Sequence, residues 1–197
     1  MDAETKNYID SLEAGNIPWK RMFTAYGTAG HYAELLPALE QITDADEWKK
    51  VFFKISDFEH QSTMFPPAPF VFIFLIRILE KKLEEKADDI VEKLIDQFTY
   101  YINICIEAEQ MEHAPQLDHF SDLLDEQNLL PADYTEDDLM DVFENPEAVS
   151  DELFYSFYHY SLIVLSQIPD ILDQYKKYTN QIQKLRDMME SVSFLVK

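Results

Sequence analysis

Glycine occurs only at positions 15, 27 and 30, so the long remainder of the chain after Gly30 contains none. Tight β-hairpin loops need residues with positive φ, and glycine adopts such angles at no steric cost. Because this residue is missing from most of the chain, we expect few hairpins there. The distribution of glycine therefore predicts an all-α fold.

The stretch from Phe70 to Ile76, continued by Ile78 and Leu79, is apolar on every side of a helix. A helix without a polar face is enclosed by neighbouring elements, so we expect the central core helix here. The prolines of residues 61–69 disfavour helix before it and predict a rigid, extended connection. The apolar run from Pro69 to Ile76 is shorter than the roughly 20 residues that span a bilayer, so we expect no membrane segment.

Apolar residues recur at helical spacing along most of the chain. The spacing and the capping residues predict helices over 4–14, from Pro18 to Tyr26, over 31–42, from a capping box at Thr43–Asp46, from Ile90 to Ile106 after a charged link over 80–89, over 117–130, from Thr135, over 150–167 and from Pro169 to Val196. Helix pairs of roughly 40 residues are typical of an α-solenoid, in which antiparallel pairs stack. The alternative is an irregular helical bundle.

The 82 residues from Leu94 to Tyr175 contain 19 Asp and Glu residues and neither Lys nor Arg. The whole chain has a formal net charge of -22, so this segment supplies -19 of it. The segment is also rich in apolar residues at helical spacing. It is therefore expected to form folded helices with an acidic surface rather than a disordered acidic tail.

A helical surface with charges of one sign lacks the intrahelical ion pairs that stabilise surfaces with both positive and negative charges. Its field repels nucleic acid and anionic lipid and attracts basic proteins. We therefore expect a basic protein partner, with no direct binding to nucleic acid and no membrane association. Solubility alone is the simpler interpretation of the same charge. The candidate partner-binding residues are Asp122, Asp125, Glu126, Glu136, Asp137, Asp138, Asp141, Glu144, Tyr155 and Tyr158, with Phe154 and Phe157 expected in the core.

The sequence contains no recognisable catalytic or cofactor motif. P-loops, dinucleotide fingerprints and nucleophile elbows need glycines at fixed positions, and none follows Gly30. The single pair with di-iron spacing, Asp57 and His60, is too little for a metal site, and residues 133–144 lack the calcium-loop pattern. We expect no enzymatic activity, no cofactor and no metal. The lone Cys105 excludes an internal disulfide, which favours the cytoplasm.

Short motifs in the first half of the chain follow one another in a fixed order. They are Ile17-Pro-Trp19, Ala25-Tyr-Gly-Thr-Ala29, Leu35-Leu-Pro-Ala-Leu39, Trp48, His60-Gln61 and Pro69-Phe70. The order resembles that of a group of bacterial HEAT-like proteins, similar to the immunity proteins of polymorphic toxin systems. In that group a helix ends near the Leu-Pro pair. The resemblance covers residues 17–82.

The resemblance implies a HEAT-like α-solenoid that binds a protein, with a cognate toxin domain as the expected partner. The motif positions it identifies as structural are Trp19, Tyr26, Gly27, Pro37, His60, Gln61 and Pro69. The expected organisation is one α-helical domain over residues 1–197, with a family-like half over 1–85, an acidic helical half over 86–175 and the end of a capping helix over 176–197. The expected function is that of an immunity-type protein that occludes a basic toxin or effector.

Two alternatives belong to other functional classes. One is a general scaffold or adaptor without a toxin partner. The other is a helical ligand-binding or enzymatic domain, with a pocket lined by the Tyr and His residues of the last two helix pairs. A pocket with convergent polar groups would favour the second alternative.

Overall fold

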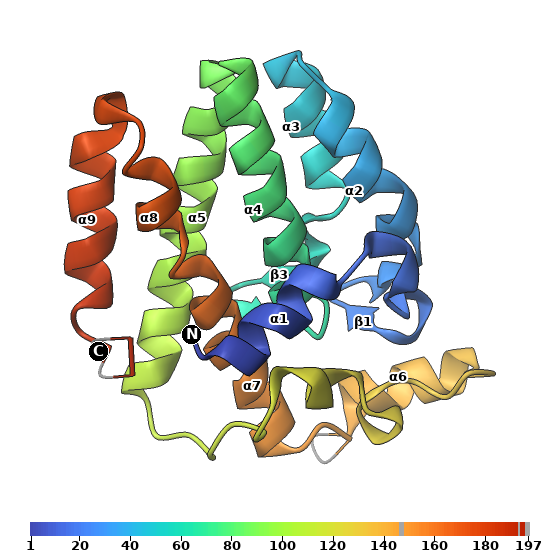
Figure 1. Ribbon diagram of the computed structural model, residues 1–197. Coiled ribbons are helices and arrows are strands. Elements are labelled where there is room, and N and C mark those ends of the chain that lie inside the picture. The colour runs from blue at the N-terminus through green and yellow to red at the C-terminus, as the bar shows by residue number, and fades with distance from the viewer. Residues whose placement is uncertain (146–147, 193, 196–197) are drawn as a thin grey trace.

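Two long helices, α4 (Ala68–Glu85) and α5 (Asp88–Gln110), lie side by side at the centre of the computed structural model, which describes residues 1–145, 148–192 and 194–195 (Figure 1). The other helices are α1 (Ala3–Ser11), α2 (Tyr32–Gln41), α3 (Ala45–Phe53), α6 (Glu136–Glu144), α7 (Asp151–Leu165), α8 (Ile168–Leu172) and α9 (Thr179–Met189). In Figure 1, α2 and α3 lie on one side of the central pair, and α8 and α9 lie on the other. The predicted all-α character of the chain is confirmed.

Helix α4 forms the centre because it is apolar all round: 13 of its 18 residues are buried. Pro69 lies in its first turn, where a missing N–H costs no hydrogen bond. The helix ends at Lys86, which adopts the left-handed conformation with φ 58°. Residues 80–85, expected in a charged link, therefore form the last turns of α4, because Leu83 is buried and extends its apolar face.

Helix α7 packs against both central helices. Its start is set by Ser150, whose hydroxyl accepts a hydrogen bond from the Leu153 amide at 3.2 Å. Buried apolar side chains form one continuous cluster that runs from Ile9 to Val192. In a solenoid each helix pair contacts only its neighbours along the chain, so these contacts do not confirm the stacking of helix pairs.

Helix α1 crosses the front of α4 in Figure 1 and is fixed by a cation at its carboxyl end. The Arg77 guanidinium donates hydrogen bonds to the carbonyl oxygens of Leu12, at 2.6 Å, and Ile9, at 2.8 Å. A positive charge at this end satisfies free carbonyl groups and complements the helix dipole.

Two short hairpins replace expected helix and extended chain. Strands β1 (Phe23–Thr24) and β2 (Gly27–Thr28) pair where a helix from Pro18 was expected. Strand β3 (Glu59–His60) lies just before the expected extended connection and pairs with β4 (Thr63–Met64) inside it. In the turn between β3 and β4, Gln61 and Ser62 have positive φ although neither is glycine. The scarcity of glycine therefore did not exclude a hairpin here.

Contacts within the hairpin and from α7 hold this turn in place. The Ser62 amide donates to a Glu59 carboxylate oxygen at 2.8 Å. From α7, the Tyr158 hydroxyl donates to the Ser62 carbonyl at 3.2 Å and accepts from the Met64 amide at 3.1 Å. These bonds offset the steric cost of positive φ at residues with side chains.

Several expected helices are shorter or tighter than predicted. The helix expected over 117–130 is replaced by two 3-10 turns. The helix expected from Pro169 divides into α8, a 3-10 turn and α9. Val196, the expected end of that helix, lies outside the described residues. Asp44, rather than Thr43, caps α3. The 3-10 turns are η1 (Ala14–Asn16), η2 (Trp19–Arg21), η3 (Ala29–His31), η4 (Ser56–Phe58), η5 (Phe120–Leu124), η6 (Glu126–Asn128) and η7 (Lys176–Tyr178).

Candidate partner-binding surface

Helix α6 extends away from the body of the protein, and none of its residues is buried (Figure 1). Its start follows from a capping box: the Thr135 hydroxyl accepts from the Asp138 amide at 3.3 Å, and the Asp138 carboxylate accepts from the Thr135 amide at 2.7 Å. The hydrogen bond from the Thr135 amide lowers the pKa of Asp138. Asp138 therefore has a structural role, and the predicted cap is confirmed.

The other acidic residues of α6 are exposed to solvent. They are Glu136, Asp137, Asp141 and Glu144. None of the ion pairs found among the described residues includes them. Their charges are therefore directed at solvent or at a partner.

Exposed apolar side chains accompany these carboxylates. Met140 is 50% exposed and Phe143 is 44% exposed. Phe143 contacts the body of the protein through the ring of Phe23, with the ring centroids 6.1 Å apart. These two side chains give α6 a partly apolar face that is exposed to solvent.

A hollow of about 330 Å³ separates α6 from α7. Aromatic rings form much of its wall, among them Phe23, Phe65, Phe143 and Phe154. Asp151, in the first turn of α7, contributes a carboxylate.

A second hollow of about 650 Å³ lies between the end of α5 and the start of α7. We name it the His113 pocket; its lining includes Glu107, Met111, Glu112, His113, Asp151, Phe154, Tyr155 and Tyr158. The imidazole of His113 stacks on the ring of Tyr155 with the centroids 3.6 Å apart. Met111, at its rim, is 70% exposed.

Phe154 and Asp151 line both hollows, so the two hollows adjoin. We name the whole area the acidic surface: α6, the hollow beside it and the His113 pocket. It contains four of the eight large apolar side chains that are exposed in the described chain, namely Met111, Met140, Phe143 and Phe154. Among the described residues lining the two hollows there is neither Lys nor Arg.

The tyrosines expected as exposed anchors are buried. Tyr155 is covered by His113 and by its own helix packing, and Tyr158 uses its hydroxyl to hold Ser62 and Met64. Burial raises the pKa of both phenols. Phe154, expected in the core, is 40% exposed, whereas Phe157 is buried as expected. The prediction that Phe154 lies in the core was wrong, because the side of α7 that carries residue 154 faces solvent.

The remaining predicted binding residues lie in the 3-10 turns η5 and η6 or, for Asp125, between them. Glu126 forms an ion pair with Arg21, with Oε1 and Nη2 2.6 Å apart. Asp122 accepts a hydrogen bond from the His119 amide at 2.9 Å. Asp125 is exposed. Two of these three carboxylates therefore have partners within the chain.

The motif positions divide into core and surface. Trp19 is buried and donates its indole N–H to the Ala14 carbonyl at 2.7 Å, and Pro69 is buried in α4. Tyr26 and His60 join the tips of the two hairpins, with the phenol oxygen 3.0 Å from Nδ1. The other positions are Gly27 in β2, Gln61 in the second hairpin turn and the exposed Pro37.

Pro37 lies in the interior of α2, which continues to Gln41. The helix predicted over 31–42 is therefore confirmed, and the helix end near the Leu-Pro pair that the similar group of proteins has does not occur here. The proline removes one backbone donor from the helix but does not end it.

Other reactive side chains lie apart from the acidic surface. Cys105 is fully buried, and this burial raises the pKa of its thiol. His159 and Glu109 form an almost buried pair at 3.2 Å. In the parts of the chain that the structure describes, no three His, Cys, Asp or Glu side chains gather as a metal site would require, and no helix has the length and apolar character to cross a membrane.

No protein-family model matches the chain, and neither a curated protein nor a solved structure is significantly similar to it.

Proposed function

We propose that this chain is a non-catalytic protein-binding module whose acidic surface covers a basic region of a partner protein. The observation that carries the proposal is the composition of that surface: four exposed apolar side chains lie among unpaired carboxylates. Interfaces draw affinity from buried apolar anchors, while complementary charge speeds and orients association. A basic partner with apolar residues at its binding site fits both features.

Within this proposal we favour an immunity-type role, as the motifs of residues 17–82 suggest. A nuclease toxin needs a basic surface to hold phosphate groups. An acidic protein with apolar anchors would cover that surface and exclude nucleic acid from it. The proposal includes a HEAT-like arrangement of helix pairs in the N-terminal half and a cytoplasmic location, which the single cysteine favours.

A second candidate function is favoured by the His113 pocket. Its volume of about 650 Å³ is in the range of small-molecule sites, and His113 and the rings of Tyr155 and Tyr158 line it. Because the pocket is acidic, its ligand would be a small aromatic or apolar cation.

The experiment that tests the main proposal compares capture by three forms of the protein. The first is the unchanged chain, the second carries Asp137→Lys, Asp141→Lys and Glu144→Lys, and the third carries Glu34→Lys, Glu92→Lys and Glu190→Lys. All six residues are exposed, and both variants change the net charge equally. Asp138 is left unchanged because it caps α6.

Each immobilised form is exposed to lysate of the source cells at low and at moderate salt, and the retained proteins are identified by mass spectrometry. We expect one basic protein to be retained by the unchanged chain and by the control variant, and to be lost from the α6 variant. A partner encoded in the neighbouring gene would support the immunity role. Equal retention by all three forms would contradict the use of α6, and several unrelated partners would favour a scaffold.

A further inference from the structure

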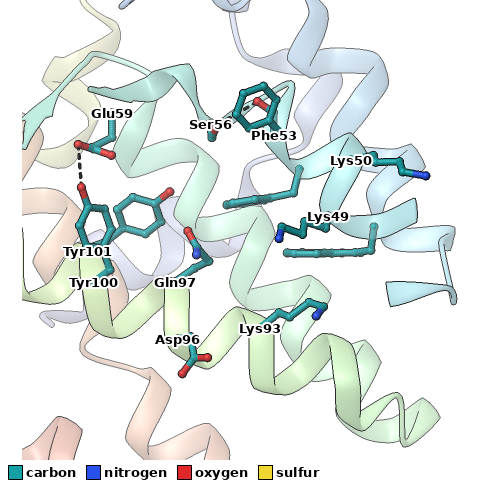
Figure 2. A pocket seen from close by; sticks show the side chains of 12 residues that line it. Lys49, Lys50, Phe53, Ser56, Glu59, Lys93, Asp96, Gln97, Tyr100 and Tyr101 are labelled. Atoms are coloured by element: carbon teal, nitrogen blue, oxygen red, sulfur yellow. Dashed lines mark hydrogen bonds between the residues drawn. The ribbon is translucent and has the colours of Figure 1, made fainter. Parts of the chain in front are cut away.

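A cavity of about 660 Å³ lies between α3 and α5, apart from the acidic surface (Figure 2). It shares no lining residue with the His113 pocket or with the hollow beside α6. Its volume is that of a small-molecule site rather than a packing defect.

Aromatic rings form the walls of this cavity. The Trp48 and Phe52 rings stack with their centroids 5.0 Å apart and an interplanar angle of 10°. Phe53 is 78% exposed, and Tyr100, on α5, is exposed as well. Together with the acidic surface, this cavity accounts for most of the large exposed apolar side chains in the described chain.

Two ammonium groups face this cavity from opposite helices. Figure 2 shows Lys49 of α3 reaching across the cavity towards Gln97, with Lys93 of α5 nearby, while Lys50 points away. No ion pair within the described chain includes Lys49 or Lys93. What sets these two lysines apart from the other lysines outside ion pairs is that they line the same cavity from two helices.

The two carboxylates of the lining do not neutralise these lysines. Glu59 accepts hydrogen bonds from the Tyr100 hydroxyl, at 3.2 Å, and from the Ser62 amide, at 2.8 Å. Asp96 also lines the cavity, but none of the ion pairs among the described residues joins it to either lysine. The positive charge of Lys49 and Lys93 is therefore available to an anion.

A buried donor in the same wall also lacks a partner. The Nε1 atom of Trp48 is covered from solvent and makes no hydrogen bond within the described part of the chain. Buried donors are nearly always paired in folded proteins, so this indole N–H marks a polar group that the packing beneath the cavity surface leaves unsatisfied.

We infer that this cavity binds a small organic anion with a flat aromatic body, whose carboxylate contacts Lys49 and Lys93 and whose ring packs against the exposed rings of Phe53 and Tyr100. The flat walls select the ring and the two lysines select the charge. This site goes beyond the proposed partner binding and does not depend on it.

The probe is 2-naphthoate, and its neutral counterpart 2-naphthalenemethanol is the matched ligand control. Binding is followed by NMR through the indole N–H signal of Trp48, which a Trp19→Phe or a Trp48→Phe variant distinguishes from that of Trp19. The test variant carries Lys49→Gln and Lys93→Gln. The control variant carries Lys20→Gln and Lys184→Gln, which remove two exposed lysines elsewhere.

We expect 2-naphthoate to shift the Trp48 signal to saturation and to bind about tenfold more weakly to the test variant, but with unchanged affinity to the control variant. The neutral alcohol should bind about tenfold more weakly than naphthoate to the unchanged chain. A third variant, Phe53→Ser, should weaken both ligands because the exposed ring is a wall of the site.

The spectra themselves report whether each variant remains folded. A Trp48 signal that does not shift, or that shifts equally with the alcohol, would overturn the inference. Equal naphthoate affinity of the test and control variants would overturn it as well.

Discussion

The guanidinium of Arg21 holds the carboxylate of Glu126 through two parallel hydrogen bonds, from Nη1 to Oε2 at 2.9 Å and from Nη2 to Oε1 at 2.6 Å. The Arg21 Nε–H also donates to the Leu130 carbonyl at 2.6 Å, and the Leu130 amide donates to the Arg21 carbonyl at 2.9 Å. These four bonds attach residues 126–130, in the second half of the loop between α5 and α6, to η2. They therefore fix the segment from which α6 extends.

Glu126→Gln should loosen this attachment without unfolding the protein. Loss of the charge-assisted pair exposes the backbone bonds around Leu130, so we expect the Leu130 amide to exchange its hydrogen at least several times faster. Hydrogen exchange measured by NMR checks this expectation. Amides of α4, such as that of Phe72, serve as the internal control and should exchange at unchanged rates.

The same pair predicts a dependence on pH. Hydrogen bonding to Arg21 lowers the pKa of Glu126 below its ordinary value of 4.5. The contribution of the pair to stability is therefore present above pH 4.5 and is lost as the pH falls through the lowered pKa. Denaturation measured between pH 6 and pH 2 should show a smaller loss below pH 4.5 for Glu126→Gln than for the unchanged chain. Parallel curves would contradict a role for this pair.

Tyr158→Phe should destabilise the protein by about 1–3 kcal/mol, because the buried Met64 amide loses its acceptor. The ring still fills its place, so the loss reports the hydroxyl alone. Urea unfolding gives the change, with Tyr8→Phe as a control whose hydroxyl makes no hydrogen bond within the described chain. Partner binding should be unaffected, since Tyr158 is buried. Reduced binding with normal stability would instead support the prediction from the sequence that Tyr158 contacts the partner.

The elements that were predictable from the sequence are those with a strong local signal. The apolar run of α4, the stripe of α5 and the caps at Thr135 and Ser150 each contain their own physical cause. The turn at Gln61 does not, because its positive φ angles depend on a hydroxyl supplied by α7, far away in the chain. The distribution of glycine in the sequence therefore could not predict this turn.

The candidate surface was predictable only in part. Charge placed the acidic residues of α6 correctly on the exterior, since a carboxylate without a partner must remain in water. Burial of the aromatic residues of α7 was harder to predict, because apolar and aromatic residues predominate along this helix and no continuous polar stripe marks its outer face. The pairing of Glu126 with Arg21 joins distant parts of the chain, and no local pattern indicates it.

Gly27→Ala should cost about 1–3 kcal/mol of stability, because Gly27 has φ 147°, a conformation that side chains rarely adopt. No atom lies close enough to clash with an added Cβ, so the cost is one of backbone strain. Gly15→Ala is the matched control. Its added Cβ also meets nothing, and it should stabilise the chain by about 0.4–1 kcal/mol. Equal effects in thermal unfolding would contradict the strain.

Met140→Ser and Phe143→Ser should weaken binding of the captured basic partner by about tenfold each, as expected for central apolar anchors. Stability should change little, because both side chains are about half exposed in the free protein. Affinity is measured by titration calorimetry at two salt concentrations. The salt dependence should stay the same in these variants, because the carboxylates that steer the partner are unchanged.

Phe53→Ser is the matched control for these variants. Phe53 is more exposed than either residue of α6, but it lies at the cavity between α3 and α5. A partner bound at the acidic surface does not reach that cavity, so its affinity should be unchanged. Loss of affinity in Phe53→Ser with none in Phe143→Ser would move the partner from α6 to α3 and would contradict the proposed binding mode.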